Sequence, residues 1–125
     1  MSNTALSLEQ IVGSTIWCGF HGTDPNDPGV AAVCSLLADN KLGGVIFYGY
    51  NITTPVQTRK LVECFKQARY DAVISVDQEG GKVSRLTEAK GFRPSKSLNE
   101  IAKLSDQEIS AYYESMAAEL ADYGF

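Results

Sequence analysis

The residues best suited to chemistry follow a short apolar run near the middle of the chain. Residues 72–76 (AVISV) are rich in β-branched types, which predicts a strand buried on both faces. Asp77 and Glu79 come directly after this run, and the glycine pair at 80–81 predicts a tight turn before Arg85. Parallel α/β folds place their ligands at the carboxyl ends of strands, so we expect the functional site in this segment.

Asp77 and Glu79 invite comparison with the paired carboxyl groups of glycosidases. Such pairs stand about 5–9.5 Å apart, and residues two apart in an extended segment point to the same side. The two groups would then compete for one side of a pocket, so we do not favour them as a catalytic pair. We instead expect Glu79 to accept loop N–H groups or to pair with Lys82 or Arg85.

The other polar residues each have a structural alternative. Asp77 either binds a ligand or caps the glycine turn, and Arg85 either binds a ligand or pairs with a neighbouring acid. His21 is the only histidine, and we interpret it as a hydrogen-bonded loop residue. The glycine pair lacks the spacing of a phosphate-binding loop. No cofactor is therefore expected.

Composition limits the partners. The chain has 125 residues, 44% hydrophobic and 21% charged, with a formal net charge of -4. The net negative charge and the lack of a cluster of basic residues argue against a nucleic-acid-binding protein. No apolar run is long enough to span a membrane, so no membrane partner is expected. Three cysteines without metal-ligand spacing predict reduced, buried thiols, no metal site and a cytoplasmic protein.

The site segment must be positioned by a regular alternation of strands and helices. Apolar runs predict strands at 14–20, 42–50 and 72–76. Helical spacing predicts helices at 30–40, 54–68 and 105–123, with shorter helical turns at 6–12 and 98–104. The alternating order favours an α/β fold with a parallel sheet and right-handed crossovers, a βαβαβα unit.

Two helix starts carry clear capping signals. Thr54, Pro55 and Gln57 predict the first, and Ser105 with Glu108 forms a capping box at the second. The buried stripe of the first helix is predicted to hold Val56, Leu61, Cys64, Phe65 and Ala68. The second helix presents Ile109, Tyr112, Tyr113, Met116 and Leu120 on one face, which we interpret as core.

The segment 76–85, VDQEGGKVSR, resembles the signature of glycoside hydrolase family 3, in its β-N-acetylhexosaminidase branch. Residues 42–52 (LGGVIFYGYNI) resemble that family's second strand, and residues 19–23 (GFHGT) resemble the end of its first. The likeness extends over about residues 11–125. It implies a TIM-type barrel, of which this chain is similar only to the first three βα units, a partial barrel covering its first half.

The resemblance also implies roles. The motif's first Asp binds sugar hydroxyls in the family and corresponds to Asp77, and its Arg lines the substrate pocket and corresponds to Arg85. The family's Lys-His pair, acid/base His and nucleophilic Asp have no counterpart here, and His21 matches none of them. We therefore expect residues 1–125 to form one partial domain that binds an N-acetylhexosamine-type, cell-wall-derived sugar without a catalytic residue of its own.

A second interpretation is a non-catalytic remnant that binds sugar or forms oligomers. About eight strands are needed to close and fill a barrel, so three parallel strands leave open edges and one uncovered sheet face. We expect this face to pair with a second copy, most simply as a homodimer, or with the remainder of a longer chain.

Overall fold

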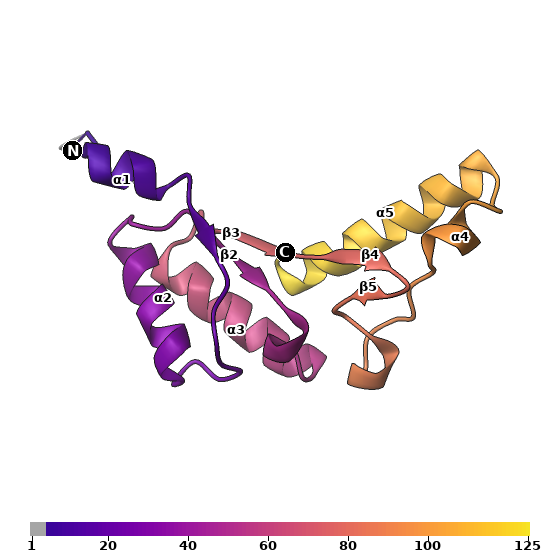
Figure 1. The fold of residues 1–125 in the computed structure, drawn as a ribbon, viewed down its shortest axis with the longest axis horizontal. Coiled ribbons are helices and arrows are strands. Elements are labelled where there is room, and N and C mark those ends of the chain that lie inside the picture. Colours follow the sequence, from indigo (N-terminus) through magenta and orange to yellow (C-terminus); the bar gives the residue numbers. More distant parts are fainter. Residues whose placement is uncertain (1–4) are drawn as a thin grey trace.

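The computed structural model describes residues 5–125, in which helices and strands alternate as far as β3 and a hairpin and two helices follow (Figure 1). The helices are α1 (Leu8–Gly13), α2 (Pro28–Ala38), α3 (Pro55–Ala68), α4 (Leu98–Ile101) and α5 (Asp106–Tyr123), with short 3-10 turns η1 (Gly49–Asn51) and η2 (Glu88–Lys90). The strands are β1 (Trp17–Cys18), β2 (Gly44–Phe47), β3 (Val73–Val76), β4 (Gln78–Gly80) and β5 (Val83–Ser84).

The first three strands form a parallel sheet in the order β1-β2-β3, as predicted. Cys18 pairs with Val45, and Val45 pairs with Ile74. Strand β1 is shorter than the predicted 14–20 because the hydroxyls of Ser14 and Thr15 donate to carbonyls of the last turn of α1. These residues therefore finish a helix rather than begin a strand.

Helices α2 and α3 cover one face of the sheet and form the core with it (Figure 1). Val45 and Phe47 of β2 are fully buried against this layer. Phe20, Phe47 and Phe65 pack edge to face, with ring centroids 4.9 Å apart for both pairs that include Phe20. Alternate β2 residues thus anchor the strand whose end carries part of the candidate site.

The other sheet face is uncovered, and the prediction that residues 72–76 are buried on both faces is wrong. Val73 is 41% exposed and Trp17 is 53% exposed, whereas Ala72 and Ile74 are buried. The helices of residues 5–125 cover only one side of this sheet, so strand residues alternate between core and solvent.

Helix α3 begins as predicted, but its buried face is different. Thr54 Oγ1 accepts from the N–H of Gln57 at 3.1 Å, while the side chain of Gln57 bonds back to Thr53 rather than to the cap. Val56 is 80% exposed, so its assignment to the buried stripe is wrong. Its position in the first turn lies on the solvent side, and Thr58 takes the buried position.

Helix α5 carries the predicted capping box and ends at Gly124, where φ is 89°. Its C-terminal end packs on the core, where the rings of Phe125 and Phe47 lie 5.3 Å apart. None of its residues is fully buried, and Tyr113 is exposed, so its interpretation as a core helix holds only in part.

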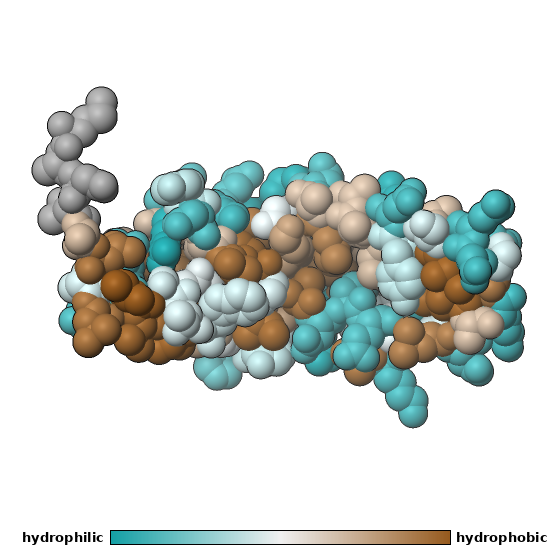
Figure 2. All heavy atoms as spheres, turned by 90° about the horizontal axis from the view of Figure 1, so that it is seen from above, coloured by the Kyte–Doolittle hydropathy of each residue, from teal (hydrophilic) through white to brown (hydrophobic). Residues whose placement is uncertain are grey.

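Apolar side chains also gather around α1, at the end of the molecule that Figure 2 shows beside the grey residues. Exposed there are Leu6, Leu8, Ile11 and Val12. Among the helices of residues 5–125, none is long and apolar enough to cross a bilayer.

The three cysteines carry free thiols, as predicted, but they are half-buried rather than buried. Cys34 of α2 and Cys64 of α3 place their Sγ atoms 3.4 Å apart across the helix interface. Burial together with this neighbour raises the pKa of the Cys34 thiol to about 12. The Cys34 thiol is therefore neutral at physiological pH.

Candidate functional site

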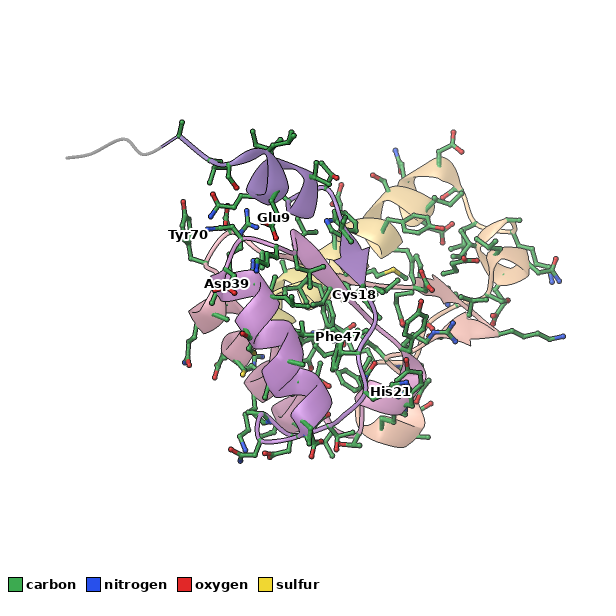
Figure 3. The ribbon with its side chains drawn as sticks, turned by 60° about the vertical axis from the view of Figure 1, so that its left-hand side comes forward. Glu9, Cys18, His21, Asp39, Phe47 and Tyr70 are labelled. Carbon is green, nitrogen blue, oxygen red and sulfur yellow. The ribbon has the colours of Figure 1, made fainter. Side chains whose placement is uncertain are left out.

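The carboxyl ends of β1, β2 and β3 gather the candidate site residues. His21 follows β1, Tyr48 and Tyr50 follow β2, and Asp77 follows β3. Figure 3 shows His21 at the end of the sheet opposite Glu9 and Tyr70. Parallel pairing places these strand ends at one edge, which is where α/β folds bind ligands.

The structure brings Asp77 and Arg85 together. Asp77 Oδ2 lies 3.9 Å from Arg85 Nη2, with 45% of the Asp77 side chain and 29% of the Arg85 side chain exposed. This distance is longer than a hydrogen bond, and such a half-exposed ion pair contributes about 1 kcal/mol at most. Asp77 accepts no hydrogen bond within residues 5–125, so its capping of the glycine turn is not observed. Its oxygens are available to a ligand.

The guanidinium of Arg85 is incompletely paired. Its Nε atom is buried and has no hydrogen-bond partner among the described residues. A buried donor without a partner costs about 1–3 kcal/mol, and such groups are rare in folded proteins. The unpaired donor and the accessible carboxylate of Asp77 together offer complementary groups to a polyol.

Gln78 fixes the backbone that presents Arg85. Its Oε1 accepts from the N–H groups of Arg85 at 2.9 Å and Leu86 at 3.0 Å, and its Nε2 donates to the Leu86 carbonyl at 3.0 Å. We did not predict this role. Gln78 lies between two acidic residues in the sequence, and this position does not indicate which backbone groups its amide will bind in the fold.

The predicted loop 77–85 contains a small antiparallel hairpin, β4–β5, which sequence reasoning missed. Gly80 and Gly81 have φ of 86° and 59°, so the predicted turn is confirmed. A Cβ on Gly80 would also lie 2.0 Å from the Lys96 carbonyl oxygen. The turn therefore needs glycine both for its backbone conformation and for space.

Glu79 does not take the role expected of it. Its side chain is exposed and makes no hydrogen bond or ion pair with Lys82, Arg85 or the loop within the described part of the chain. The reason is the hairpin: Gln78 and Gly80 are the more buried residues of β4, and Glu79 lies on its solvent side.

Asn51 ties the ends of β1 and β2 together from a fully buried position. Its Nδ2 donates to the carbonyls of Phe20 at 2.9 Å and Gly22 at 3.1 Å. Its Oδ1 accepts from the N–H of Tyr48 at 2.9 Å. The side chain thereby satisfies backbone groups that the short strands leave unpaired.

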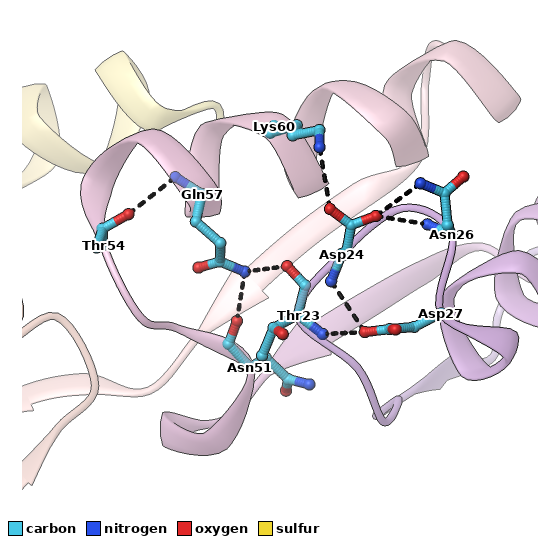
Figure 4. A network of polar contacts seen from close by, with 8 residues as sticks. All are labelled: Thr23, Asp24, Asn26, Asp27, Asn51, Thr54, Gln57 and Lys60. Carbon is cyan, nitrogen blue, oxygen red and sulfur yellow. Dashed lines mark hydrogen bonds and ion pairs between the residues drawn. The ribbon is translucent and has the colours of Figure 1, made fainter.

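A second set of polar contacts extends this tie to helix α3 (Figure 4). Gln57 Nε2 donates to the carbonyls of Thr23 at 2.7 Å and Asn51 at 2.9 Å. Asp27 accepts from the N–H groups of Asp24 and Thr23, and these hydrogen bonds lower the pKa of Asp27. The loop after β1 is therefore held in place although it contains no regular structure.

His21 is not hydrogen-bonded through its side chain within residues 5–125, so that expectation is wrong. Its ring stacks on Tyr50, with centroids 5.2 Å apart and planes 19° from parallel. Tyr48 and Tyr50 stack in the same way at 5.6 Å and 18°. The carbonyls on both sides of His21 are already bound by Asn51, and the exposed ring packs on an aromatic partner instead.

Within residues 5–125 no group of three or more His, Cys, Asp or Glu side chains is placed to hold a metal ion. The absence of a cofactor stays a prediction. Among residues 5–125 the arrangement brings together one carboxylate, one guanidinium and a row of aromatic rings.

The glycosyl hydrolase family 3 N-terminal domain model matches residues 25–125 of the chain. The chain belongs to this family. The match contains the whole 77–85 segment, so the resemblance inferred from VDQEGGKVSR is confirmed.

Relatives and solved structures agree with this assignment. A beta-hexosaminidase of Pseudomonas aeruginosa (strain LESB58) is 41% identical over 51 residues, which cover 41% of this chain and 15% of that protein. A beta-hexosaminidase of Alkalilimnicola ehrlichii is 40% identical over 55 residues, covering 43% and 16% of the two chains. The chain thus spans only a small part of the length of the curated relatives it matches.

Among solved structures, a glycoside hydrolase family 3 beta-N-acetylglucosaminidase from Paenibacillus sp. str. FPU-7 superposes with a TM-score of 0.69 and 30% identity. The superposition covers 84% of this chain and 20% of that one. NagZ from Neisseria gonorrhoeae, in complex with N-trifluoroacetyl-D-glucosamine, superposes with a TM-score of 0.67 and 22% identity, over 88% and 33% of the two chains. The α/β fold with a parallel sheet is that of the family's N-terminal domain.

Proposed function

We propose that this chain supplies the sugar-binding strand ends of a β-N-acetylhexosaminidase-type barrel, with Asp77 and Arg85 as the substrate-binding pair. The observation that carries the proposal is the juxtaposition of Asp77 with Arg85 at the end of β3, inside the family motif. The carboxylate accepts from sugar hydroxyls, and the guanidinium donates to them in a fixed fork. The expected ligand is a small carbohydrate of the N-acetylhexosamine type.

Two comparisons support this ligand class. The Pseudomonas aeruginosa relative is named a beta-hexosaminidase, and the Paenibacillus structure, 30% identical to this chain, is that of a beta-N-acetylglucosaminidase. The resemblance assigns acid/base and nucleophile roles to segments that follow the third βα unit. We therefore propose that residues 1–125 alone bind the sugar and do not hydrolyse it.

The direct test is an NMR titration of the chain with N-acetylglucosamine. We expect amide shifts in residues 76–86 and a dissociation constant raised about tenfold or more by Asp77→Asn or Arg85→Gln, since hydrogen bonds to charged groups contribute about 1.5–3 kcal/mol. Glu79→Gln is the matched control, because Glu79 lies in the same hairpin, is exposed and contacts neither residue. Unchanged affinity in both site variants would refute the assignment.

An assay with an aryl N-acetylglucosaminide tests the second half of the proposal. Without an acid/base group and a nucleophile, positioning alone does not supply the roughly 8 kcal/mol or more by which enzymes lower a barrier, so no turnover above background is expected. Turnover that disappears in Glu79→Gln would instead restore the local carboxylate pair as a catalytic unit.

A second candidate function is assembly, and the uncovered sheet face favours it. Val73 and Trp17 expose apolar side chains on that face, and no strand of residues 5–125 pairs with the outer edges of β1 and β3. We propose that a second copy covers this face as a homodimer. Sedimentation at micromolar concentration should show a dimer that Val73→Lys dissociates, and a monomer at all concentrations would refute this.

A further inference from the structure

Three aromatic rings are stacked in a row at the strand ends, and the function proposed above does not use them. We call His21, Tyr48 and Tyr50 the aromatic stack. His21 comes from the loop after β1, and the two tyrosines come from the segment after β2. Tyr50 pairs with both other rings, yet 53% of it stays exposed.

The aromatic stack adjoins the Asp77–Arg85 pair. Gly49 lies between the two tyrosines, and a Cβ placed on it would stand 3.8 Å from Arg85 Cδ. Lys90 Nζ donates to the Gly49 carbonyl at 2.6 Å. The side chain of Arg85 therefore passes along the same short backbone segment that carries Tyr48 and Tyr50.

The stack is held in position before any ligand arrives. The ring of Tyr48 packs against the backbone of Gly19, because a Cβ added to Gly19 would lie only 2.7 Å from Tyr48 Cε2. The N–H of Tyr48 is bound by Asn51, whose side chain also holds the carbonyls on both sides of His21. A preorganised surface loses little conformational freedom on binding.

We infer that the aromatic stack is a carbohydrate platform, which takes the apolar face of a pyranose ring next to Arg85. The C–H bonds on that face are positively polarised and are attracted to the negative face of an aromatic ring. The hydroxyls at the edge of the same ring can then reach Arg85 and Asp77. This inference rests on the proposed function, because it assumes that the ligand of the Asp77–Arg85 pair is a sugar.

The test is the same N-acetylglucosamine titration with variants of Tyr50. Tyr50→Ala should raise the dissociation constant about fivefold, and Tyr50→Phe, which keeps the ring, should stay within about twofold of the original value. Tyr70→Ala is the matched control, because Tyr70 is 86% exposed at the opposite end of the sheet (Figure 3). His21→Ala, an exposed change, provides a second variant should Tyr50→Ala not fold.

The outcomes separate the two proposals. If Asp77→Asn weakens binding but neither Tyr50→Ala nor His21→Ala does, the platform is refuted and the Asp77–Arg85 site stands. If Tyr50→Ala and Asp77→Asn both weaken binding and Tyr50→Phe does not, the platform and the Asp77–Arg85 site are both supported. If Tyr50→Ala weakens binding and Asp77→Asn does not, the placement of the sugar between the platform and that pair is refuted. If the unaltered chain shows no saccharide-dependent shifts at millimolar sugar, the proposed function fails and the platform fails with it.

Discussion

Replacing Asn51 with alanine should weaken the fold and loosen the site at once. The side chain is fully buried and makes three hydrogen bonds, all to backbone groups at the ends of β1 and β2. Asn51→Ala leaves two carbonyls and one N–H without these partners, and none of them gains a replacement from alanine.

The magnitude follows from these contacts. A typical hydrogen bond contributes about 1 kcal/mol net, and a buried group left unpaired adds its desolvation cost, so the loss should be about 3 kcal/mol. This is a large share of the roughly 5–15 kcal/mol by which such domains are stable. Asn51→Asp keeps the acceptor for Tyr48 but turns oxygen atoms toward the carbonyls of Phe20 and Gly22, so its cost should be at least as large.

Urea denaturation followed by circular dichroism measures the effect. Asn26→Ala is the control, because Asn26 is exposed and bonds only within its own loop, and its change should stay within about 0.5 kcal/mol. A loss below about 1 kcal/mol in Asn51→Ala, with an unchanged denaturant slope, would refute the view that these contacts hold the two strand ends together.

Three further predictions concern the thiols, the hairpin and the acid response. Oxidation by a small disulfide should link Cys34 to Cys64, seen as the loss of two hydrogens in the intact mass and a raised melting temperature, and Cys34→Ser should abolish both. Gly80→Ala should destabilise the chain by about 2 kcal/mol or more in urea, because φ is 86° and the new Cβ would meet backbone; wild-type stability would contradict this. Hydrogen bonds from the N–H of Asp24 and of the residue before it lower the pKa of Asp27, so its stabilisation is present above the unfolded value of about 3.9 and is lost as pH falls through the lower folded value. In Asp27→Asn the free energy of unfolding, measured in urea, should fall less steeply below about pH 4 than in the original chain. The same pH dependence in both proteins would contradict the assignment.

Much of the fold could be predicted because local signals and tertiary packing agree. The start of α3 at Thr54 and the capping box at Ser105 depend on contacts within one turn, which sequence spacing reports directly. The lengths of the strands and the exposure of Val56 could not be predicted in this way. The start of β1 depends on where α1 ends, which the hydroxyl contacts of Ser14 and Thr15 decide. The exposure of Val56 depends on which side of α3 packs on the core, which residue type alone does not report.

The site shows the same division. The position of Asp77 at a strand end could be predicted, and the motif indicated Arg85, but their contact depends on the β4–β5 hairpin, which turns the chain back. The roles of Gln78 and Asn51 could not be predicted, because they bind backbone groups distant in the chain or defined only by the turn. Aromatic stacking at His21 likewise needs β1 and β2 to be neighbours.

The contrast between these side chains is the strongest argument for where a ligand binds. Asn51, Gln57 and Gln78 use their amides on backbone groups around the strand ends. Arg85 lies among them with a buried Nε that no described residue accepts, and Asp77 faces it at a distance too long for a hydrogen bond. A fold that pairs its neighbouring polar groups so fully would gain from pairing these as well, and a hydroxyl-rich ligand supplies both missing partners at once. Arg85→Gln should therefore cost much more in sugar affinity than in the free energy of unfolding, and an equal loss in both would mean that Arg85 serves the fold rather than the ligand.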